Sequence, residues 1–381
     1  MKRFISALIA LLVLNACSDK PKTEQLSKAD IDDFKSYKVD IEIEAEPIQD
    51  FIEEVEIIGL EETDEALLSF VTDAFSMENH FVLKSGYKGD IFIYSKNGVF
   101  ERKINRTGNG PEEYAVIGNM WAEGDTVVVF DSNRMRVVKY DFDGNFISGE
   151  KINHLGLHAM PYKDGYVLDM SLALVEDSLK YNLLFVDSDL YKISVANPYE
   201  NPRPSGMIWL ATSFSEYDEK VLFHHIYGDT IYSLIDYKAV PLFSIDFGDN
   251  WLWGQGDTYT NPAEERKLMT TSMVKMFFTE VSQQHILFTT ISRNGTFLLD
   301  RESGAYHRFD LKNKGKGSFM MNAIGWNGAK MLFSTSSTDI AEFLEGIPAE
   351  NVKFAEGNTL DEIESSENPV LMWVKFKVVT K

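Results

Sequence analysis

Residues 125–152 read DTVVVFDSNRMRVVKYDFDGNFISGEKI, and this stretch decides the fold. It contains an unbroken apolar run at residues 126–130, an alternating run at residues 136–140, and the turn sequence DGN at residues 143–145. An unbroken apolar run is typical of a strand buried on both faces, whereas alternation is typical of a strand with one wet face. Asp or Asn beside Gly supplies the positive φ of a tight hairpin turn. The stretch therefore predicts antiparallel strands that pass from a buried inner strand to a half-exposed outer strand.

Similar phrases recur along the chain. Each begins with an apolar triplet, and the six triplets are centred on Val82, Val129, Val167, Leu222, Leu287 and Leu332. The interval averages about fifty residues, the period of a propeller blade built from three or four strands. The sequence therefore predicts an all-β fold, a six-bladed β-propeller over residues 51–381. An open β-sandwich or a two-domain chain is the alternative.

The two ends of the predicted propeller complete its last blade. The sixth unit lacks a full set of strands after Ser336, and apolar strand-like runs stand at Val55–Ile58 and at Val370–Phe376. Joining the first and last strands in one sheet closes the ring and removes open sheet edges. We therefore expect these two runs to pair in the sixth blade.

Two segments interrupt the strand pattern and predict short helical inserts. The first includes Asn261–Met269, where an asparagine cap is followed by proline and, three residues after the cap, by glutamate. The second covers Thr338–Glu367. Such inserts either carry binding or fill space on one rim of a repeat fold.

The amino terminus predicts export and a lipid anchor. Two basic residues precede an apolar run at residues 4–14, and LNAC follows at residues 14–17. The run is shorter than the roughly 20 residues that span a bilayer, so it indicates a signal peptide over residues 1–16. The small residue before Cys17 resembles the lipobox of bacterial lipoproteins, in which the thiol is acylated. Residues 17–50 then form the acylated cysteine and a polar tether.

Cysteine and charge limit the remaining possibilities. Cys17 is the only cysteine, so the fold contains no internal disulfide. The chain has 37 basic and 59 acidic residues and a net charge of −22. A field of this sign repels polyanions, and no basic stripe is present, which excludes nucleic acid as a partner.

A resemblance to a known group joins these observations. Residues 108–146 look like an NHL-type repeat, and the chain from the lipobox to NPVLMWVKFK at residues 368–377 resembles the six-bladed β-propeller lipoproteins of Bacteroides and its relatives. The resemblance implies a palmitate-bearing lipoprotein of the cell envelope, anchored to the outer membrane. Whether the propeller faces the periplasm or the cell surface stays open.

The stretch RTGNGPEEY, residues 106–114, has the glycines of a phosphate-binding loop but not its setting. No helix follows it, no lysine or hydroxyl ends it, and two glutamates occupy the place of an anion. A corner between two blades is therefore favoured. The functional alternative is that Arg106, Glu112 and Tyr114 face the mouth of the central channel and bind a ligand.

Aromatic residues and histidines supply the other candidate sites. Trp251 and Trp253 stand two apart beside glycines, a composition that suits either ligand stacking or one face of the core. His224 and His225 are adjacent, so on a strand they point to opposite faces and a shared metal is not expected. No metal site is predicted.

These features favour a binding protein without a cofactor over an enzyme. No nucleophile elbow, zincin motif or dinucleotide fingerprint is present, and no catalytic residue is assigned. The expected ligand is a small molecule, glycan, peptide or envelope protein. The alternative is a lactonase-like or lyase-like propeller enzyme with a divalent metal in its channel. A purely structural subunit of an outer-membrane complex is a third possibility.

Overall fold

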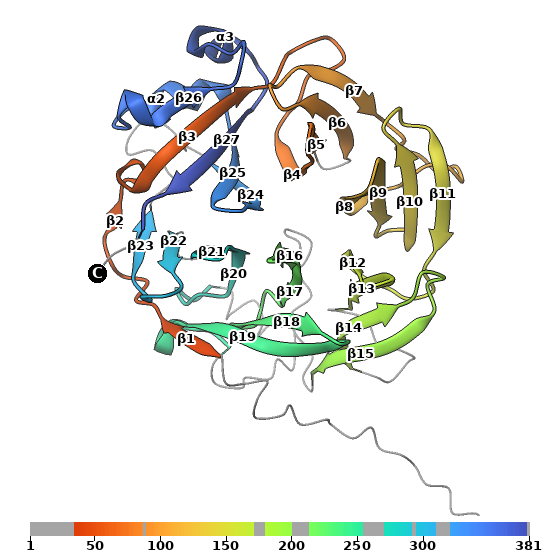
Figure 1. Cartoon of the computed structure of the whole chain (residues 1–381). Coiled ribbons are helices and arrows are strands. Elements are labelled where there is room, and N and C mark those ends of the chain that lie inside the picture. Colours follow the sequence, from red (N-terminus) through yellow and green to blue (C-terminus); the bar gives the residue numbers. More distant parts are fainter. Residues whose placement is uncertain are drawn as a thin grey trace, which may run out of the picture.

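The computed structural model describes residues 34–86, 89–170, 180–199, 213–253, 270–291, 295–309 and 321–378. The strands of these residues form six sheets that stand around a central axis like the blades of a propeller (Figure 1). The predicted all-β, six-bladed architecture is confirmed.

The first three blades each contain four antiparallel strands, which run from the centre of the ring outward. Blade 1 consists of β4 (Val71–Ser76), β5 (His80–Ser85), β6 (Asp90–Ser95) and β7 (Phe100–Ile104). Blade 2 consists of β8 (Ile117–Glu123), β9 (Thr126–Asp131), β10 (Arg136–Asp141) and β11 (Phe146–Lys151). Blade 3 consists of β12 (Ala159–Tyr162), β13 (Gly165–Asp169), β14 (Tyr181–Val186) and β15 (Lys192–Pro198).

The other three blades each carry a fifth, parallel strand on the outer edge. Blade 4 consists of β16 (Phe214–Tyr217), β17 (Lys220–His224), β18 (Thr230–Ile235), β19 (Lys238–Asp246) and β1 (Lys35–Lys38). Blade 5 consists of β20 (Met276–Val281), β21 (His285–Ile291), β22 (Gly295–Asp300), β23 (Tyr306–Phe309) and β2 (Ala45–Glu46). Blade 6 consists of β24 (Asn322–Asn327), β25 (Lys330–Thr335), β27 (Val370–Phe376), β3 (Ile52–Gly59) and β26 (Val352–Phe354).

Ring closure follows the expected pattern. In blade 6 the carboxyl-terminal β27 pairs antiparallel with β25 on one side and with the amino-terminal β3 on the other, with Leu371 opposite Ile58 and Val374 opposite Val55. These four side chains are at most 1% exposed. Because both ends of the propeller are hydrogen-bonded into one sheet, no blade is left with an open junction.

Part of the predicted tether is packed onto the propeller. Strand β1 lies parallel to β19, and Tyr37, Val39 and Ile41 are 8%, 3% and 3% exposed. Their period-2 spacing is a strand signal, which intervening charged residues conceal in the sequence. The ordered fold therefore begins by residue 35 instead of near residue 51.

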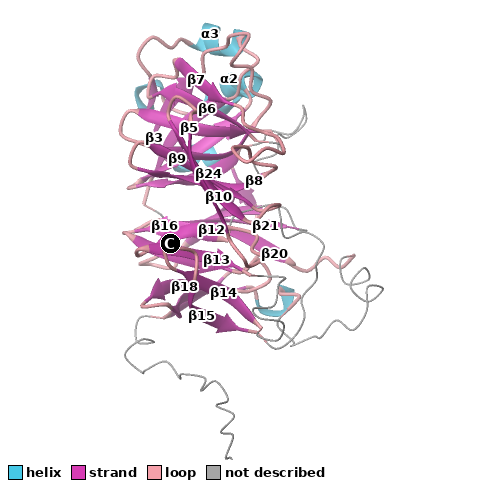
Figure 2. Ribbon diagram, turned by 90° about the vertical axis from the view of Figure 1, so that its right-hand side faces the viewer, coloured by secondary structure: helices cyan, strands magenta, loops and turns pink. Residues whose placement is uncertain are grey.

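Short helices occupy the connection between β25 and β27. Helices α2 (Ile340–Leu344) and α3 (Leu360–Ser365) both fall within the predicted insert Thr338–Glu367. Thr359 caps α3 by accepting a hydrogen bond from the Glu362 amide at 3.3 Å. Figure 2 shows α2 and α3 at one edge of the ring, near β7. The other predicted helix, Asn261–Met269, lies outside the described residues.

Single 3₁₀ turns complete the described elements. These are η2 (Ile48–Phe51), η4 (Gly248–Asn250), η5 (Ser337–Asp339) and η6 (Ala349–Asn351).

Shortening one buried side chain of the closing strand β27 is expected to destabilise the whole ring. Leu371→Ala removes a fully buried side chain from the β27 core face, so the free energy of unfolding should fall by about 2–5 kcal/mol. Urea unfolding followed by tryptophan fluorescence measures this change. The exposed Val378→Ala serves as a control and should change stability by less than about 0.5 kcal/mol. Equal effects of the two variants would contradict the role of β27.

Candidate functional site

The loop RTGNGPEEY joins the outer strand β7 of blade 1 to the inner strand β8 of blade 2 and is held as a structural corner. The Tyr114 amide donates to the Arg106 carbonyl at 3.0 Å, which closes the loop on itself. The Arg134 guanidinium donates to the carbonyls of Gly108 and Glu113 at 2.7 Å and 3.2 Å. Since an arginine fills the loop from the protein side, its glycines serve the turn.

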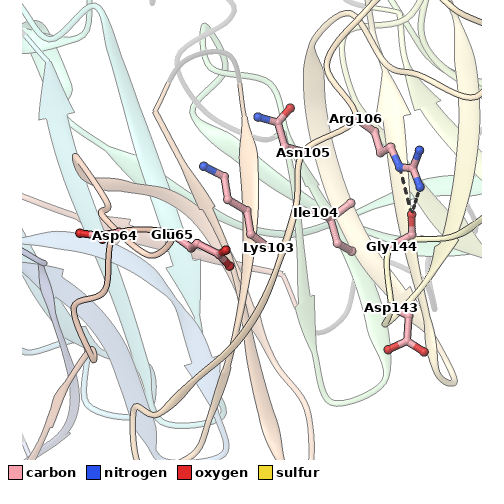
Figure 3. A pocket seen from close by; sticks show the side chains of 8 residues that line it. All are labelled: Asp64, Glu65, Lys103, Ile104, Asn105, Arg106, Asp143 and Gly144. Carbon is pink, nitrogen blue, oxygen red and sulfur yellow. Dashed lines mark hydrogen bonds between the residues drawn. The ribbon is translucent and has the colours of Figure 1, made fainter.

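Arg106 lies at the outer rim of the ring and not at the channel mouth. Its Nε and a terminal nitrogen donate to the Gly144 carbonyl at 3.0 and 2.9 Å, in the β10–β11 hairpin of blade 2. Figure 3 shows this contact in a groove of about 500 Å³. The groove is lined by Asp64, Glu65, Lys103, Ile104, Asn105, Arg106, Asp143 and Gly144.

Salt bridges and hydrogen bonds account for most of the charge in this rim groove. Lys103 pairs with Asp90 at 2.8 Å, and Arg102 pairs with Asp143. Because the groove is wide open and its cations are already bonded, blade contact explains it. A ligand role for Arg106 stays a prediction.

The other two candidates of the loop face in opposite directions. Glu112 is exposed, and its backbone carbonyl accepts a hydrogen bond from the Tyr140 hydroxyl at 2.8 Å. Tyr114 is fully buried, and its hydroxyl donates to the Gly89 carbonyl at 2.9 Å. Burial raises the pKa of Tyr114 to about 12. The ring of Tyr114 therefore belongs to the core between blades 1 and 2.

The two tryptophans separate into core and mouth. Trp251 is 6% exposed and stacks on Phe247, with ring centroids 5.5 Å apart. Trp253 is half-buried and meets Tyr227 edge to face, with centroids 5.1 Å apart. Trp253 packs in an apolar group that we term the mouth cluster. Its members are Leu157, Ile226, Tyr227, Trp253, Met276, Phe278 and Ile291.

The mouth cluster lies at one end of the central channel. Leu157 stands in the connection before β12, Tyr227 in the connection between β17 and β18, and Trp253 in the connection before β20. These connections leave the ring at the end where β12 and β20 begin. Because Leu157 adjoins blade 3 and Met276 belongs to blade 5, the cluster reaches across the intervening blade 4.

A buried polar knot lies beside the mouth cluster. The Ser213 hydroxyl donates to the Asp169 carboxylate and lies 3.3 Å from His158 Nδ1. Asp169, His158 and Ser213 are 0%, 5% and 6% exposed. In a serine hydrolase the hydroxyl gives its proton to histidine, whereas here it is bonded to the carboxylate. The knot therefore ties blade 3 to the start of blade 4.

The histidine doublet is built into the same region. The His224 ring lies 4.4 Å from the Phe277 ring, and its Nε2 bonds the Gly228 carbonyl at 3.0 Å. Burial lowers the pKa of His224 to about 4, so the ring is neutral at pH 7. The Tyr227 amide donates to His225 Nδ1 at 3.2 Å. Among the described residues, no group of three or more His, Cys, Asp or Glu could hold a metal ion.

Three charged residues lie on strands near the axis of the ring, and the sequence analysis did not identify them: Asp73 on β4, Lys84 on β5 and Glu280 on β20. Lys84 donates to the Ile117 carbonyl at 2.9 Å, and its charge partly offsets the burial that raises the pKa of Asp73. On β20, burial and the nearby Asp73 raise the pKa of Glu280 to about 8. The one signal for Glu280 in the sequence is a lone acid within the apolar run MFFTEV.

Comparison with known proteins identifies the family. Residues 36–375 match the family model described as "Domain of unknown function (DUF4934)". The chain belongs to this family. None of the curated proteins matches it. No helix in the described ranges has the length and hydropathy needed to cross a bilayer.

Solved structures resemble this DUF4934 protein to different degrees. A presumed exported protein of Bacteroides fragilis is 15% identical, with a TM-score of 0.69 over 90% of this chain and 99% of that chain. A DUF4221 protein of Bacteroides vulgatus is 12% identical, with a TM-score of 0.46 over 85% and 98% of the two chains. The glutaminyl cyclase of Myxococcus xanthus is 12% identical, with a TM-score of 0.31 over 68% and 100%. At 15% identity, the match to the Bacteroides fragilis protein shows a shared fold alone.

The buried histidine at the mouth predicts sensitivity to acid. The pKa of His224 is lower in the folded protein than its ordinary 6.5, so the unfolded chain binds the proton more tightly. Stability is therefore present above about pH 6.5 and falls as the pH drops toward 4. At about pH 5 the loss from this group is about 2 kcal/mol.

His224→Gln should remove this part of the acid sensitivity. Urea unfolding at about pH 7.5 and about pH 5 compares the wild type, His224→Gln and the half-exposed control His80→Gln. We expect the pH-dependent loss to shrink for His224→Gln only. If both variants keep the wild-type loss, His224 does not titrate as described.

Proposed function

We propose that this DUF4934 propeller is an envelope lipoprotein, anchored to the outer membrane through Cys17, that binds a ligand at the mouth of its channel. The anchor is supported by the lipobox-like LNAC sequence, and export also by the name of the Bacteroides fragilis relative. Several acyl chains on one residue, at roughly 0.8 kcal/mol per buried methylene, hold a folded domain on a membrane.

One observation carries the binding role: the half-buried Trp253 meets the Tyr227 ring in a cluster that includes Phe278, two residues before Glu280 on the innermost strand of blade 5. Aromatic rings beside a few polar groups in a concave place are the usual composition of a ligand site. Asp73, Lys84 and Glu280 also carry perturbed pKa values, and such groups concentrate at functional sites.

The burial of apolar surface at the mouth supplies the free energy of binding. A ligand that covers Trp253 and Phe278 removes apolar surface from water, at about 25 cal/mol per Å². The inter-blade connections set the shape of the mouth, and no bond is made or broken. The ordered ring supplies a preformed site, which limits the entropy lost on binding.

The anchor is tested by removing its thiol. Cys17→Ser should abolish incorporation of a palmitate analogue and move the protein from the membrane fraction to the soluble fraction, because the acyl chains can no longer form. Metabolic labelling and cell fractionation in the native host measure both effects. The control Ser18→Ala should label normally. Labelling of the Cys17→Ser variant would sink the anchor proposal.

The binding role is tested by a thermal-stability screen. Sugars, amino acids, peptides, and cationic and anionic aromatics are added to the full chain in mild detergent, and we expect at least one class to raise Tm. Trp253→Ala should lose that shift, whereas the exposed control Val378→Ala should keep it. A shift that survives Trp253→Ala would place binding elsewhere, and no shift in any class would contradict the role.

A further inference from the structure

Strand β20, the innermost strand of blade 5, carries an acidic residue beyond the mouth cluster. On strand β20, Met276, Phe278 and Glu280 alternate onto one face, so the carboxyl lies about 7 Å further along the strand than the Phe278 side chain. Met276 and Phe278 belong to the mouth cluster. The apolar face of the mouth therefore leads directly to Glu280.

Space is open beside this carboxyl. Strand β24 of blade 6 lies next to β20 and has Gly325 at the facing position. A β-carbon at Gly325 would stand 4.0 Å from Glu280 Oε2, and among the described residues it would meet no other atom within that distance apart from its chain neighbours. The missing side chain leaves room for another group at the carboxyl.

The charges around Glu280 leave it without a partner cation in the described part of the chain. The influences on its pKa are burial and the like charge of Asp73. Lys84 lies toward blade 2, where it bonds the Ile117 carbonyl and offsets Asp73. The other titratable group near Asp73 is His158, which lies in the polar knot.

The strands packed against β20 add no positive charge beside Glu280. Strand β16 of blade 4 carries a further acid, Glu216. Strand β24, NAIGWN, has no titratable side chain. Strand β21 has only His285, at its first residue, and Glu280 stands opposite Leu287. No positive side chain of these strands therefore neutralises the carboxylate.

We propose that the channel binds a ligand that has a cationic end, an ammonium or guanidinium group, joined to an apolar or aromatic body. Glu280 accepts the cation in the space beside Gly325, and the body packs on Phe278, Tyr227 and Trp253. The proposal rests on the proposed function and names its ligand class. Aromatic rings attract cations through their π faces, and a carboxylate completes the recognition of a guanidinium. The net charge of −22 favours the approach of cations.

Benzylguanidine and benzylurea are the probes for this proposal. The two have nearly the same shape, but benzylguanidine is cationic at every pH used and benzylurea is neutral. Isothermal titration with the full chain in detergent measures both, and 3-phenylpropanoate serves as the anionic arm. We expect benzylguanidine to bind at least about tenfold more tightly than benzylurea.

Two variants test whether Glu280 is the carboxyl that binds the cation. Glu280→Gln keeps the shape and removes the charge, so the preference for benzylguanidine should disappear. Glu302→Gln makes the same change at an exposed position of the β22–β23 hairpin and should keep the preference. Both variants should fold, since Gln at position 280 removes a charge that is costly to bury; circular dichroism and Tm check this.

The pH dependence gives an independent readout. A cation binds the ionised carboxylate, and the pKa of Glu280 is about 8, so benzylguanidine affinity should rise roughly tenfold between about pH 7 and about pH 9. Benzylurea affinity should not rise. In Glu280→Gln the rise should be absent.

The outcomes separate this proposal from the binding role itself. Equal affinity for benzylguanidine and benzylurea, or a preference that survives Glu280→Gln, contradicts the proposal of a cationic ligand. Trp253-dependent binding of benzylurea or 3-phenylpropanoate alone would keep the binding role and overturn the cation. If no probe or screened class binds, both proposals fail.

Discussion

The pairing of β3 with β27 is the constraint on which the structure depends. The two strands come from opposite ends of the propeller, and their facing apolar pairs, Leu371 with Ile58 and Val374 with Val55, are buried almost completely. In a propeller each sheet is covered on both faces by its neighbours, so an open junction would expose the faces of two blades at once. The mouth cluster draws residues from either side of blade 4, and its geometry persists only while the ring is closed.

The six blades differ in whether their outer edge is covered by a further strand. Strands β1, β2 and β26 cover the edges of blades 4, 5 and 6, whereas β7, β11 and β15 end the other three sheets. An uncovered edge can pair with another chain, and charged residues discourage this. Strand β7 has the sequence FERKI with three exposed charged residues. These charges therefore discourage the edge of blade 1 from pairing with another chain. The edges of blades 4 to 6 are instead covered by strands of the same chain.

Much of the fold could be predicted because it rests on local patterns. Inner strands such as β9 are buried on both faces and so appear as unbroken apolar runs. The closing strand could be predicted because an apolar run such as Val370–Phe376 needs a partner. Strand β1 was missed because Tyr37, Val39 and Ile41 alternate with charged residues in a polar segment.

The candidate site was harder to predict, because it depends on how distant blades meet. The sequence left Trp251 and Trp253 between ligand stacking and one face of the core. The first lies in a β-bridge and the second in a turn, and only Trp253 belongs to the mouth cluster. Glu280 could not be identified from the sequence as a candidate binding residue, because its interest depends on the glycine of β24 that lies beside it in the fold. Arg106 could not be assigned to rim or mouth, since the sequence of a loop does not reveal how far from the ring axis its side chains lie.

The pairing of β1 with β19 also has a mechanical consequence. Its four residue pairs run from Lys35 opposite Phe243 to Lys38 opposite Asp246. A pull on the chain ahead of Lys35 reaches these hydrogen bonds before any other strand of the ring. Tension from the amino-terminal side is thus borne at the circumference of blade 4, and the closing junction in blade 6 is shielded from it.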